Sequence, residues 1–217
     1  MKLTAEQIEF INQTLIKKGI KYDDIKIEVT DHIASEIEGE IKTNQKTFRE
    51  AYDQVFERWK PDFELTKAFF SFATYYPRLA RNKFEYQIKV ELIATTAVVS
   101  LLLISFQLIS DSVAKVTFIL WIKKVFVYLY FVTIGLMTFL KFLNSKSKIS
   151  STYKYKFDER CPMIISCLII VFNDKFPESI RGQNLFVLLI GTYFVFIFST
   201  IYLGLKHYQF QRKLSTQ

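Results

Sequence analysis

The chain has 217 residues, enough for one or two domains, and half of them are hydrophobic, including 22 Phe and 12 Tyr. Its net charge of +8 is uneven, because residues 1–91 hold 15 Lys and Arg against 16 Asp and Glu, whereas residues 92–217 hold 14 against 5. The basic excess therefore accompanies the apolar stretches, where membrane proteins use it to set topology, and this argues against nucleic acid as a partner. Abundant Lys, Ile, Phe and Tyr are typical of an AT-rich bacterial genome.

The polar N-terminal part is organised around residues 23–41, which carry isoleucine or valine at every fourth position. This spacing stacks the apolar side chains along one helical face, with carboxylates on the flanks and back. Asp23 or Asp24 is expected to cap the start of this helix. Such a helix is unstable alone in water, so it needs neighbouring helices to cover its apolar face. The apolar positions are Ile25, Val29, Ile33, Ile37 and Ile41.

A shorter helix is expected on each side of this segment. Thr4 and Gln7 fit a capping box that opens the first helix, and Thr47 and Glu50 fit a second one. The third helix is expected to stop at Lys60-Pro61. Three such helices make a compact antiparallel unit with a thin core. The apolar stripe of the first helix is predicted to be Ile8, Ile11, Leu15 and Ile16.

Several residues of these helices resemble the HAAS-type domain. They are Glu28-x-x-x-His32-Ile33, a short polar connection, and Phe48-Arg49-Glu50-Ala51 leading into Val55 and Pro61. That small helical module precedes transmembrane helices in bacterial membrane proteins that are often encoded with PadR-type regulators. The resemblance covers about residues 1–67. It implies a helical head before membrane spans and, loosely, a role in signalling.

Residues 66–89 differ in character from the helices before them. Aromatic and apolar side chains share one helical face here, and basic residues flank them, a pattern that suits the headgroup region of a membrane. We therefore expect an interfacial helix that is kinked near Pro77, with a fourth helix packed on the head as the equal alternative. The face comprises Phe69, Phe72, Tyr76, Leu79 and Ala80, and the bases are Arg78, Arg81 and Lys83.

Three apolar segments are long enough to cross a membrane: Leu92–Ser110, Val125–Leu143 and Asn184–Leu205. Pro162–Phe172 is apolar but would form only about 16 Å of helix, too short to span without tilt or local thinning. Val113–Ile122 is a lesser apolar segment that either lies in the outer interface or extends the second span.

Loop charges predict the topology of these segments. Residues 144–161 hold five bases, and the tail after Leu205 holds three. Placing this loop and both termini in the cytoplasm obeys the positive-inside rule but requires four crossings, so the short segment becomes the third span. We expect a multi-pass protein of the cell inner membrane with a cytoplasmic N-terminus. Because the N-terminus lacks an early apolar region, the first span is expected to be an uncleaved anchor.

The sequence offers no catalytic, cofactor-binding or metal-binding residues that rise above background. Glu28, His32 and Glu36 share one helical stripe and could supply three metal ligands, but pairing on a solvent-facing surface is the simpler interpretation. Cys161 and Cys167 do not form a CxxC pair and are expected to be small buried residues. A nucleophile beside a base, a glycine-rich phosphate loop and a mid-membrane carboxylate are all missing, so we expect no enzyme and disfavour a pump.

Together these patterns predict an all-α protein with a cytoplasmic head (1–67), an amphipathic interfacial connector (68–91) and a transmembrane domain of about four spans (92–217). The expected function is a non-enzymatic regulatory or interaction protein of the lipid bilayer. Its head would bind a protein partner, and its spans would anchor it or assemble into homo- or hetero-oligomers. The alternative is an oligomeric membrane-perturbing or pore-forming effector. The predicted partner-binding residues are Glu36, Glu40, Glu50, Asp53 and Glu57.

Overall fold

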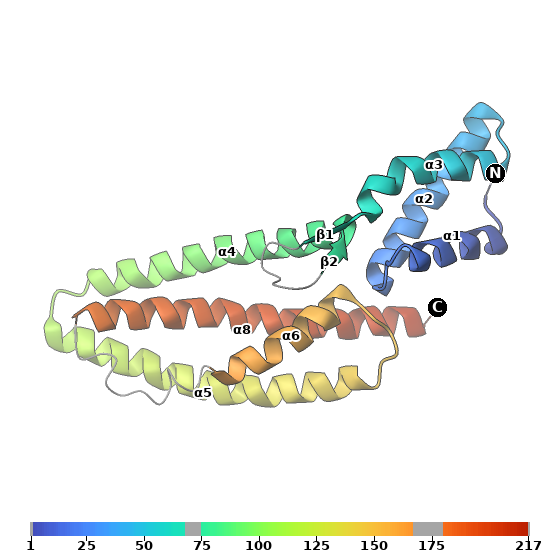
Figure 1. The fold of residues 1–217 in the computed structure, drawn as a ribbon. Coiled ribbons are helices and arrows are strands. Elements are labelled where there is room, and N and C mark those ends of the chain that lie inside the picture. The colour runs from blue at the N-terminus through green and yellow to red at the C-terminus, as the bar shows by residue number, and fades with distance from the viewer. Residues whose placement is uncertain (1, 68–74, 167–179, 217) are drawn as a thin grey trace. The chain divides into compact units, whose positions relative to one another are not determined.

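The fold is all-α, as predicted, and contains one short pair of strands in the part that the structure describes (Figure 1). This computed structural model describes residues 2–67, 75–166 and 180–216. Internal contacts divide the chain into two compact units. The first comprises residues 1–87 together with 149–152, and the second comprises residues 88–148 and 153–217.

Three helices form the head within the first unit: α1 (Ala5–Lys17), α2 (Asp23–Asn44) and α3 (Phe48–Phe63). The central helix is α2, and both α1 and α3 pack against it (Figure 1). Both predicted capping boxes are present, at Thr4 before α1 and at Thr47 before α3. Each satisfies backbone N–H groups that a helix start leaves without partners.

The core of the head is the apolar face of α2. Ile25, Val29, Ile33 and Ile37 are buried as predicted, whereas Ile41 is only half-buried. Burying one such side chain stabilises the fold by about 1.5–3 kcal/mol. Neighbouring helices contribute buried Ile11, Leu15, Ala51 and Val55. The prediction for the first helix was wrong at its ends, because Ile8 and Ile16 are exposed: a helix this short turns only its middle stripe toward α2.

Two predicted helix ends differ from the structure. The N-cap of α2 is Tyr22, whose side chain makes no capping hydrogen bond, so neither Asp23 nor Asp24 caps the helix. Both aspartates lie in the first turn, where negative charge still favours the helix dipole. The third helix runs past Pro61 to Phe63, whose buried ring packs on neighbouring aromatic rings of the same helix and offsets the cost of the proline.

The connector contains strands where a helix was predicted. Leu65–Lys67 (β1) pairs antiparallel with Tyr75–Pro77 (β2), and α4 (Arg78–Gln107) begins directly after Pro77. The expected helix is therefore wrong at residues 66–67 and 75–77. At Tyr76 the physical reason is Pro77, because a residue that precedes proline is pushed to extended backbone. Phe69 and Phe72 lie outside the described residues. From Arg78 to Gln87 the chain belongs to the first unit, which agrees with the alternative of a further helix packed on the head.

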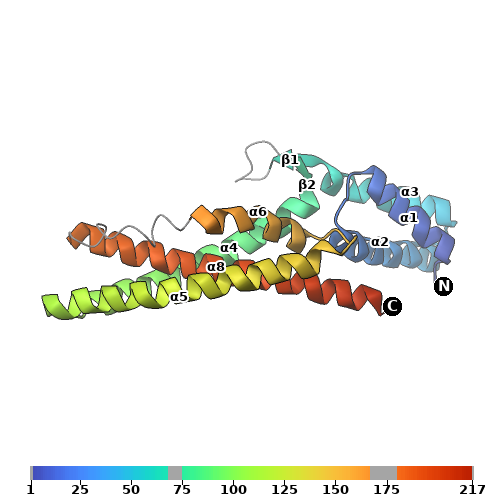
Figure 2. The ribbon, with the colours of Figure 1, turned by 90° about the horizontal axis from the view of Figure 1, so that it is seen from below.

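The second unit is built from the rest of α4 together with α5 (Ser112–Ser145), α6 (Thr152–Ser166) and α8 (Ile180–Ser215). Three helices, α4, α5 and α8, are long and apolar enough to cross a membrane, and they lie alongside one another in both views (Figures 1 and 2). Val113–Ile122 is part of α5, so this segment extends the second span rather than forming a separate piece. The predicted short span, Pro162–Phe172, lies outside the described residues beyond Ser166.

Two glycines set how closely the helices of the second unit approach α8. A Cβ on Gly204 would lie 2.8 Å from Cε2 of Phe157 in α6 and 3.2 Å from Cδ1 of Leu140 in α5. A Cβ on Gly191 would lie 3.0 Å from Cγ2 of Val99 in α4. The main core lies around α5 and α8, whereas none of the most apolar window of α4 is buried. One side of α4 is therefore open along most of its length.

Candidate functional site

Three polar side chains meet among the apolar helices of the second unit: Glu91 of α4, Arg160 of α6 and Ser199 of α8. The Arg160 guanidinium donates from Nη1 to Glu91 Oε1 at 2.7 Å and from Nη2 to Oε2 at 2.8 Å. This two-point geometry is the strongest kind of charge-assisted hydrogen bond between these groups. The Ser199 hydroxyl accepts from Arg160 Nη1 at 3.0 Å and donates to Glu91.

Burial makes this pair a structural junction. Only 9% of the Arg160 side chain and 24% of the Glu91 side chain are exposed, and the guanidinium lies 5.3 Å from the ring centre of Phe196. Removing one partner of a buried ion pair typically costs about 3–5 kcal/mol, because the other charge is left without compensation. Through this pair, α4 is held to α6 and α8.

Sequence reasoning missed this junction. Asp158, Glu159 and Arg160 are consecutive in the sequence, but only the two carboxylates pair with lysines near the surface. Asp158 lies 3.9 Å from Lys141, and Glu159 lies 3.3 Å from Lys156, whereas Arg160 is buried. The available signal was Glu91, a carboxylate next to a long uncharged segment.

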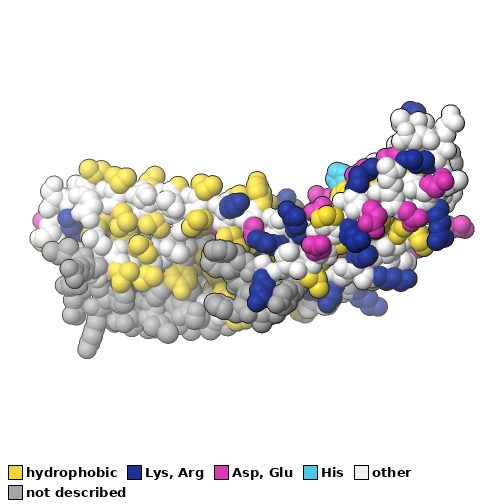
Figure 3. Space-filling model, turned by 45° about the horizontal axis from the view of Figure 1, so that its top comes forward, with side chains coloured by type: hydrophobic (Ala, Val, Ile, Leu, Met, Phe, Trp, Pro, Cys, Tyr) yellow, Lys and Arg dark blue, Asp and Glu magenta, His cyan; other side chains and the backbone are white. Residues whose placement is uncertain are grey.

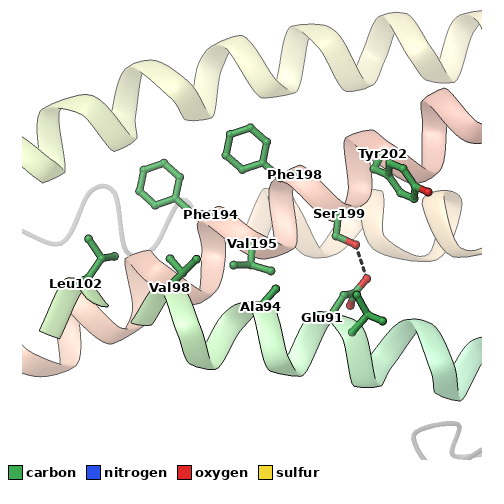
Figure 4. Close-up of a pocket in the computed structure, with 10 residues that line it drawn as sticks. Glu91, Ala94, Val98, Leu102, Phe194, Val195, Phe198, Ser199 and Tyr202 are labelled. Atoms are coloured by element: carbon green, nitrogen blue, oxygen red, sulfur yellow. Dashed lines mark hydrogen bonds between the residues drawn. The ribbon is translucent and has the colours of Figure 1, made fainter. Parts of the chain in front are cut away.

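A groove of about 600 Å³ lies between α4 and α8 beside the junction (Figure 4). Its volume is in the range typical of small-molecule sites. Apolar side chains form most of its walls, and the side chains with polar atoms are Glu91, Ser199 and Tyr202. The lining residues are Val90, Glu91, Ala94, Val98, Leu102, Phe194, Val195, Phe198, Ser199 and Tyr202.

In the first unit, two aspartates at the start of α2 hold residues 150–152, which follow α5 in the sequence. The buried Asp24 carboxylate accepts from Lys83 Nζ at 3.1 Å, from Thr152 N at 2.9 Å and from the Thr152 hydroxyl. Asp23 N donates to Ser150 O at 2.6 Å, and Ser150 N donates to Asp23 Oδ2 at 2.8 Å. The aspartates predicted as helix caps therefore bind another segment of the chain.

Glu36 and Glu40, two of the predicted partner-binding residues, converge on Arg58. Its guanidinium lies 3.1 Å from Glu36 Oε2 and 2.9 Å from Glu40 Oε1. Glu40 also accepts a hydrogen bond from Lys46 at 2.9 Å. The hydrogen bond from Lys46 has the largest effect on the Glu40 carboxyl and that from Arg58 the second largest, and together they lower its pKa to about 2. Glu36 accepts from Trp59 Nε1 at 3.0 Å. Both carboxylates thus connect α2 to α3 instead of standing free for a partner.

The other three predicted residues lie on the exposed surface of α3. Glu50 accepts from the backbone and hydroxyl of Thr47, and these hydrogen bonds lower the pKa of its carboxyl. Glu57 lies 3.2 Å from Lys60, and Asp53 is exposed. Figure 3 shows basic and acidic side chains interspersed over the head. Partner binding by the five carboxylates stays a prediction.

An aromatic stripe runs along α3 and continues onto α1. Ring centres are 5.1 Å apart for Phe10 and Tyr52, 5.9 Å apart for Phe48 and Tyr52, and 4.2 Å apart for Tyr52 and Phe56. Phe10 is 52% exposed, and the other three are half-buried. The Tyr52 hydroxyl donates to Thr14 at 2.9 Å, while burial raises its pKa. The sequence analysis did not identify this surface.

The possible metal ligands on α2 do not come together. Glu28, which lies 3.5 Å from Lys83, and His32 both line a cleft of about 360 Å³ in the first unit. Glu36 is held by Arg58 and Trp59. Across the described residues, no group of three His, Cys, Asp or Glu side chains is placed to hold a metal ion. Cys161 is half-buried, and Cys167 lies outside the described residues.

No protein-family model, curated protein or solved structure matches this chain. The resemblance to the HAAS-type domain therefore stays a prediction based on the sequence motifs of the head.

Proposed function

We propose that this chain is a non-enzymatic regulatory or interaction protein of the bacterial inner membrane, with its head binding a protein partner. The observation that carries this proposal is the partly exposed aromatic stripe of Phe10, Phe48, Tyr52 and Phe56. Large aromatic side chains provide much of the binding energy at protein interfaces when a partner buries them. The head has its own core on α2, so the stripe is not required to complete that core.

The charges beside the stripe favour a partner with basic and apolar residues. Glu50, Asp53 and Glu57 lie on the same helix as the stripe and are exposed. Carboxylates at the rim of an interface act on the rate of encounter and on specificity more than on final affinity. Glu36 and Glu40 are less suitable for this role, because Arg58 already compensates them.

The proposed topology places both termini and residues 144–161 in the cytoplasm, with α4, α5, a short third span and α8 crossing the membrane. The five bases of that loop support this orientation. A cysteine introduced by Lys148→Cys, at an exposed position, should react with a membrane-impermeant reagent only after the cells are opened. Ser147 is unsuitable as the labelling position because it is buried. Labelling in intact cells would overturn both the orientation and the four-span count.

Phe10→Asp in the full-length chain tests the docking surface, with Ile16→Asp as its matched control. Both side chains are exposed on α1, but six positions along a helix place them on different faces. Affinity purification should recover a stoichiometric partner with the wild type and with Ile16→Asp, and lose it with Phe10→Asp. Equal recovery of the partner with both variants would show that the aromatic stripe is not the docking surface.

The alternative function, a membrane-perturbing or pore-forming effector, is favoured by one observation. The most apolar window of α4 is unburied within the chain, which leaves a face for assembly with other membrane helices. Expression that depolarises cells, and still does so after deletion of residues 1–65, would support the effector. An unchanged membrane potential in cells that express the protein would support the interaction protein.

A further inference from the structure

The groove between α4 and α8 lies within the second unit and is apolar over most of its length (Figure 4). Leu102 lines one end of it, and Glu91, Ser199 and Tyr202 lie at the other (Figure 4). From Val90 to Leu102 the groove follows α4 for about 18 Å. A ligand that matches this profile has an extended apolar chain.

The ion pair at the polar end of the groove carries no net charge. Arg160 donates two hydrogen bonds to Glu91, so the negative charge of this carboxylate is compensated within the chain. The Ser199 hydroxyl adds a third hydrogen bond to the same carboxylate. The charge that selects the head group of a ligand must therefore come from residues next to this pair.

Lys206 supplies a positive charge at this end. It follows Tyr202 by one helical turn and Ser199 by two, so helical spacing places it on the face of α8 that lines the groove. Its Nζ atom lies 5.4 Å from the ring centre of Tyr202, which directs the charge at the end of the groove. No ion pair joins Lys206 to a carboxylate in the part of the chain that the structure describes. A contact with a ring leaves the charge of the lysine in place, so it is available to an anion.

The rest of α8 has the same sign of charge. The helix contains no Asp or Glu, and its last turns carry Arg212 and Lys213 in addition to Lys206. Seven positions separate Lys206 from Lys213, which places both on one face of the helix. Basic side chains at the end of an apolar helix attract anionic lipids, and each strengthens binding about fivefold. A zwitterionic head group gains less, because it carries a cation of its own.

We infer that this groove binds an anionic phospholipid of the surrounding bilayer, with one acyl chain between α4 and α8 and the phosphate at Lys206. The chain lies along Ala94, Val98 and Phe198, which line the groove. The phosphate accepts a hydrogen bond from Lys206 Nζ. Lipid reaches the groove along α4, whose most apolar window is unburied. This binding site is independent of the partner proposed for the head.

Photo-crosslinking of the full-length protein in phosphatidylcholine vesicles tests the inference. The probe is phosphatidylglycerol with a diazirine on one acyl chain, and the matched probe is phosphatidylcholine with the same diazirine chain. The phosphatidylglycerol probe should label α4 and α8 peptides about fivefold more strongly, and unlabelled phosphatidylglycerol should compete with it. High salt should reduce this preference, because it screens the charge of the lysine. Equal labelling by the two probes would overturn the assignment of the head group.

Two pairs of variants test the charge and the groove separately. Lys206→Gln should bring the labelling ratio of the two probes to about one, because it removes the charge next to the groove. Arg212→Gln is its control, since it makes the same change of charge at an exposed position on another face of α8 and should leave the ratio unchanged. An unchanged ratio with Lys206→Gln would show that the lysine does not hold the head group.

Ala94→Trp fills the groove and should reduce labelling by both probes. Ala97→Trp, at an exposed position of α4 that does not line the groove, should label as the wild type does. Equal labelling of the two tryptophan variants would overturn the groove as the site of the acyl chain.

Discussion

Gly204 is the position where a single added methyl group tests the packing of the second unit. In Gly204→Ala the new Cβ would lie 2.8 Å from Cε2 and 3.0 Å from Cδ2 of Phe157. That ring is fully buried, and Leu140 on the other side is nearly so, so neither can move away without displacing its own neighbours. Overpacking of this kind costs about 1–3 kcal/mol.

Gly135→Ala is the control for Gly204→Ala, because both substitutions change the intrinsic helix preference by the same amount. Ala is favoured over Gly inside a helix by about 0.5–1 kcal/mol, and this gain applies equally to Gly135→Ala, where a Cβ would meet nothing within 4 Å. The difference in unfolding free energy between the two variants should therefore equal the packing cost alone, about 1–3 kcal/mol. Gly191→Ala should fall between them, because its nearest neighbours are two side chains of the loosely packed α4.

Thermal unfolding of the full-length variants in detergent, followed by far-ultraviolet circular dichroism, measures this order. We expect Gly135→Ala to melt highest and Gly204→Ala lowest. Adding Phe157→Leu to Gly204→Ala should recover part of the loss, because it removes the ring that the methyl group meets. Equal melting of the Gly204 and Gly135 variants would show that α6 does not lie against α8 at Phe157.

Three further predictions concern the head. Ile33→Asp buries a carboxylate in the core and should cost several kcal/mol in unfolding free energy, whereas Ile27→Asp, at an exposed position of α2, should cost little. Hydrogen bonds from Lys46 and Arg58 lower the pKa of Glu40 from 4.5 to about 2. The ionised carboxylate therefore stabilises the fold above the pKa of the unfolded chain, and this stabilisation is lost as the pH falls toward 2. In thermal melts at a series of pH values, Glu40→Gln should show a smaller loss of stability at acid pH than the wild type. Asp24→Asn removes a charge that accepts three hydrogen bonds and should lower stability by about 1.5–3 kcal/mol in urea unfolding, while Asp31→Asn, which is exposed, leaves the midpoint unchanged.

Local signals predicted the features that depend on near neighbours in the sequence. The four-residue repeat from Ile25 to Ile37 identified the core face of α2, because helical spacing alone brings those side chains together. The capping boxes at Thr4 and Thr47 were equally local, since each joins residues three positions apart. Long uncharged runs likewise predicted helices able to cross a membrane.

Features that depend on distant pairs were not predicted. Glu91 and Arg160 are 69 residues apart, and only tertiary packing shows that they form one ion pair. Asp24 was predicted as a helix cap because its position next to a helix start fits that role, but a segment far along the chain takes its carboxylate. The strand at Tyr75–Pro77 was not predicted for a different reason. The prediction gave more weight to the helical spacing of the apolar residues than to the extended backbone that Pro77 favours in the residue before it.

The hydrogen bonds of Asp24 have a consequence for the order of events during synthesis. The helices of the head contact their neighbours in sequence and can pack as soon as they leave the ribosome, because local contacts form fastest. Thr152, however, is made 128 residues after Asp24, which at 5–20 residues per second is a delay of roughly 6–26 s. During that interval Asp23 has Lys26 of its own helix as a partner, and Asp24 has Lys83, which is made 59 residues after it. A chain whose translation stops before residue 149 would therefore keep these two lysine contacts but lack the hydrogen bonds that Ser150 and Thr152 donate to the two carboxylates in the finished protein.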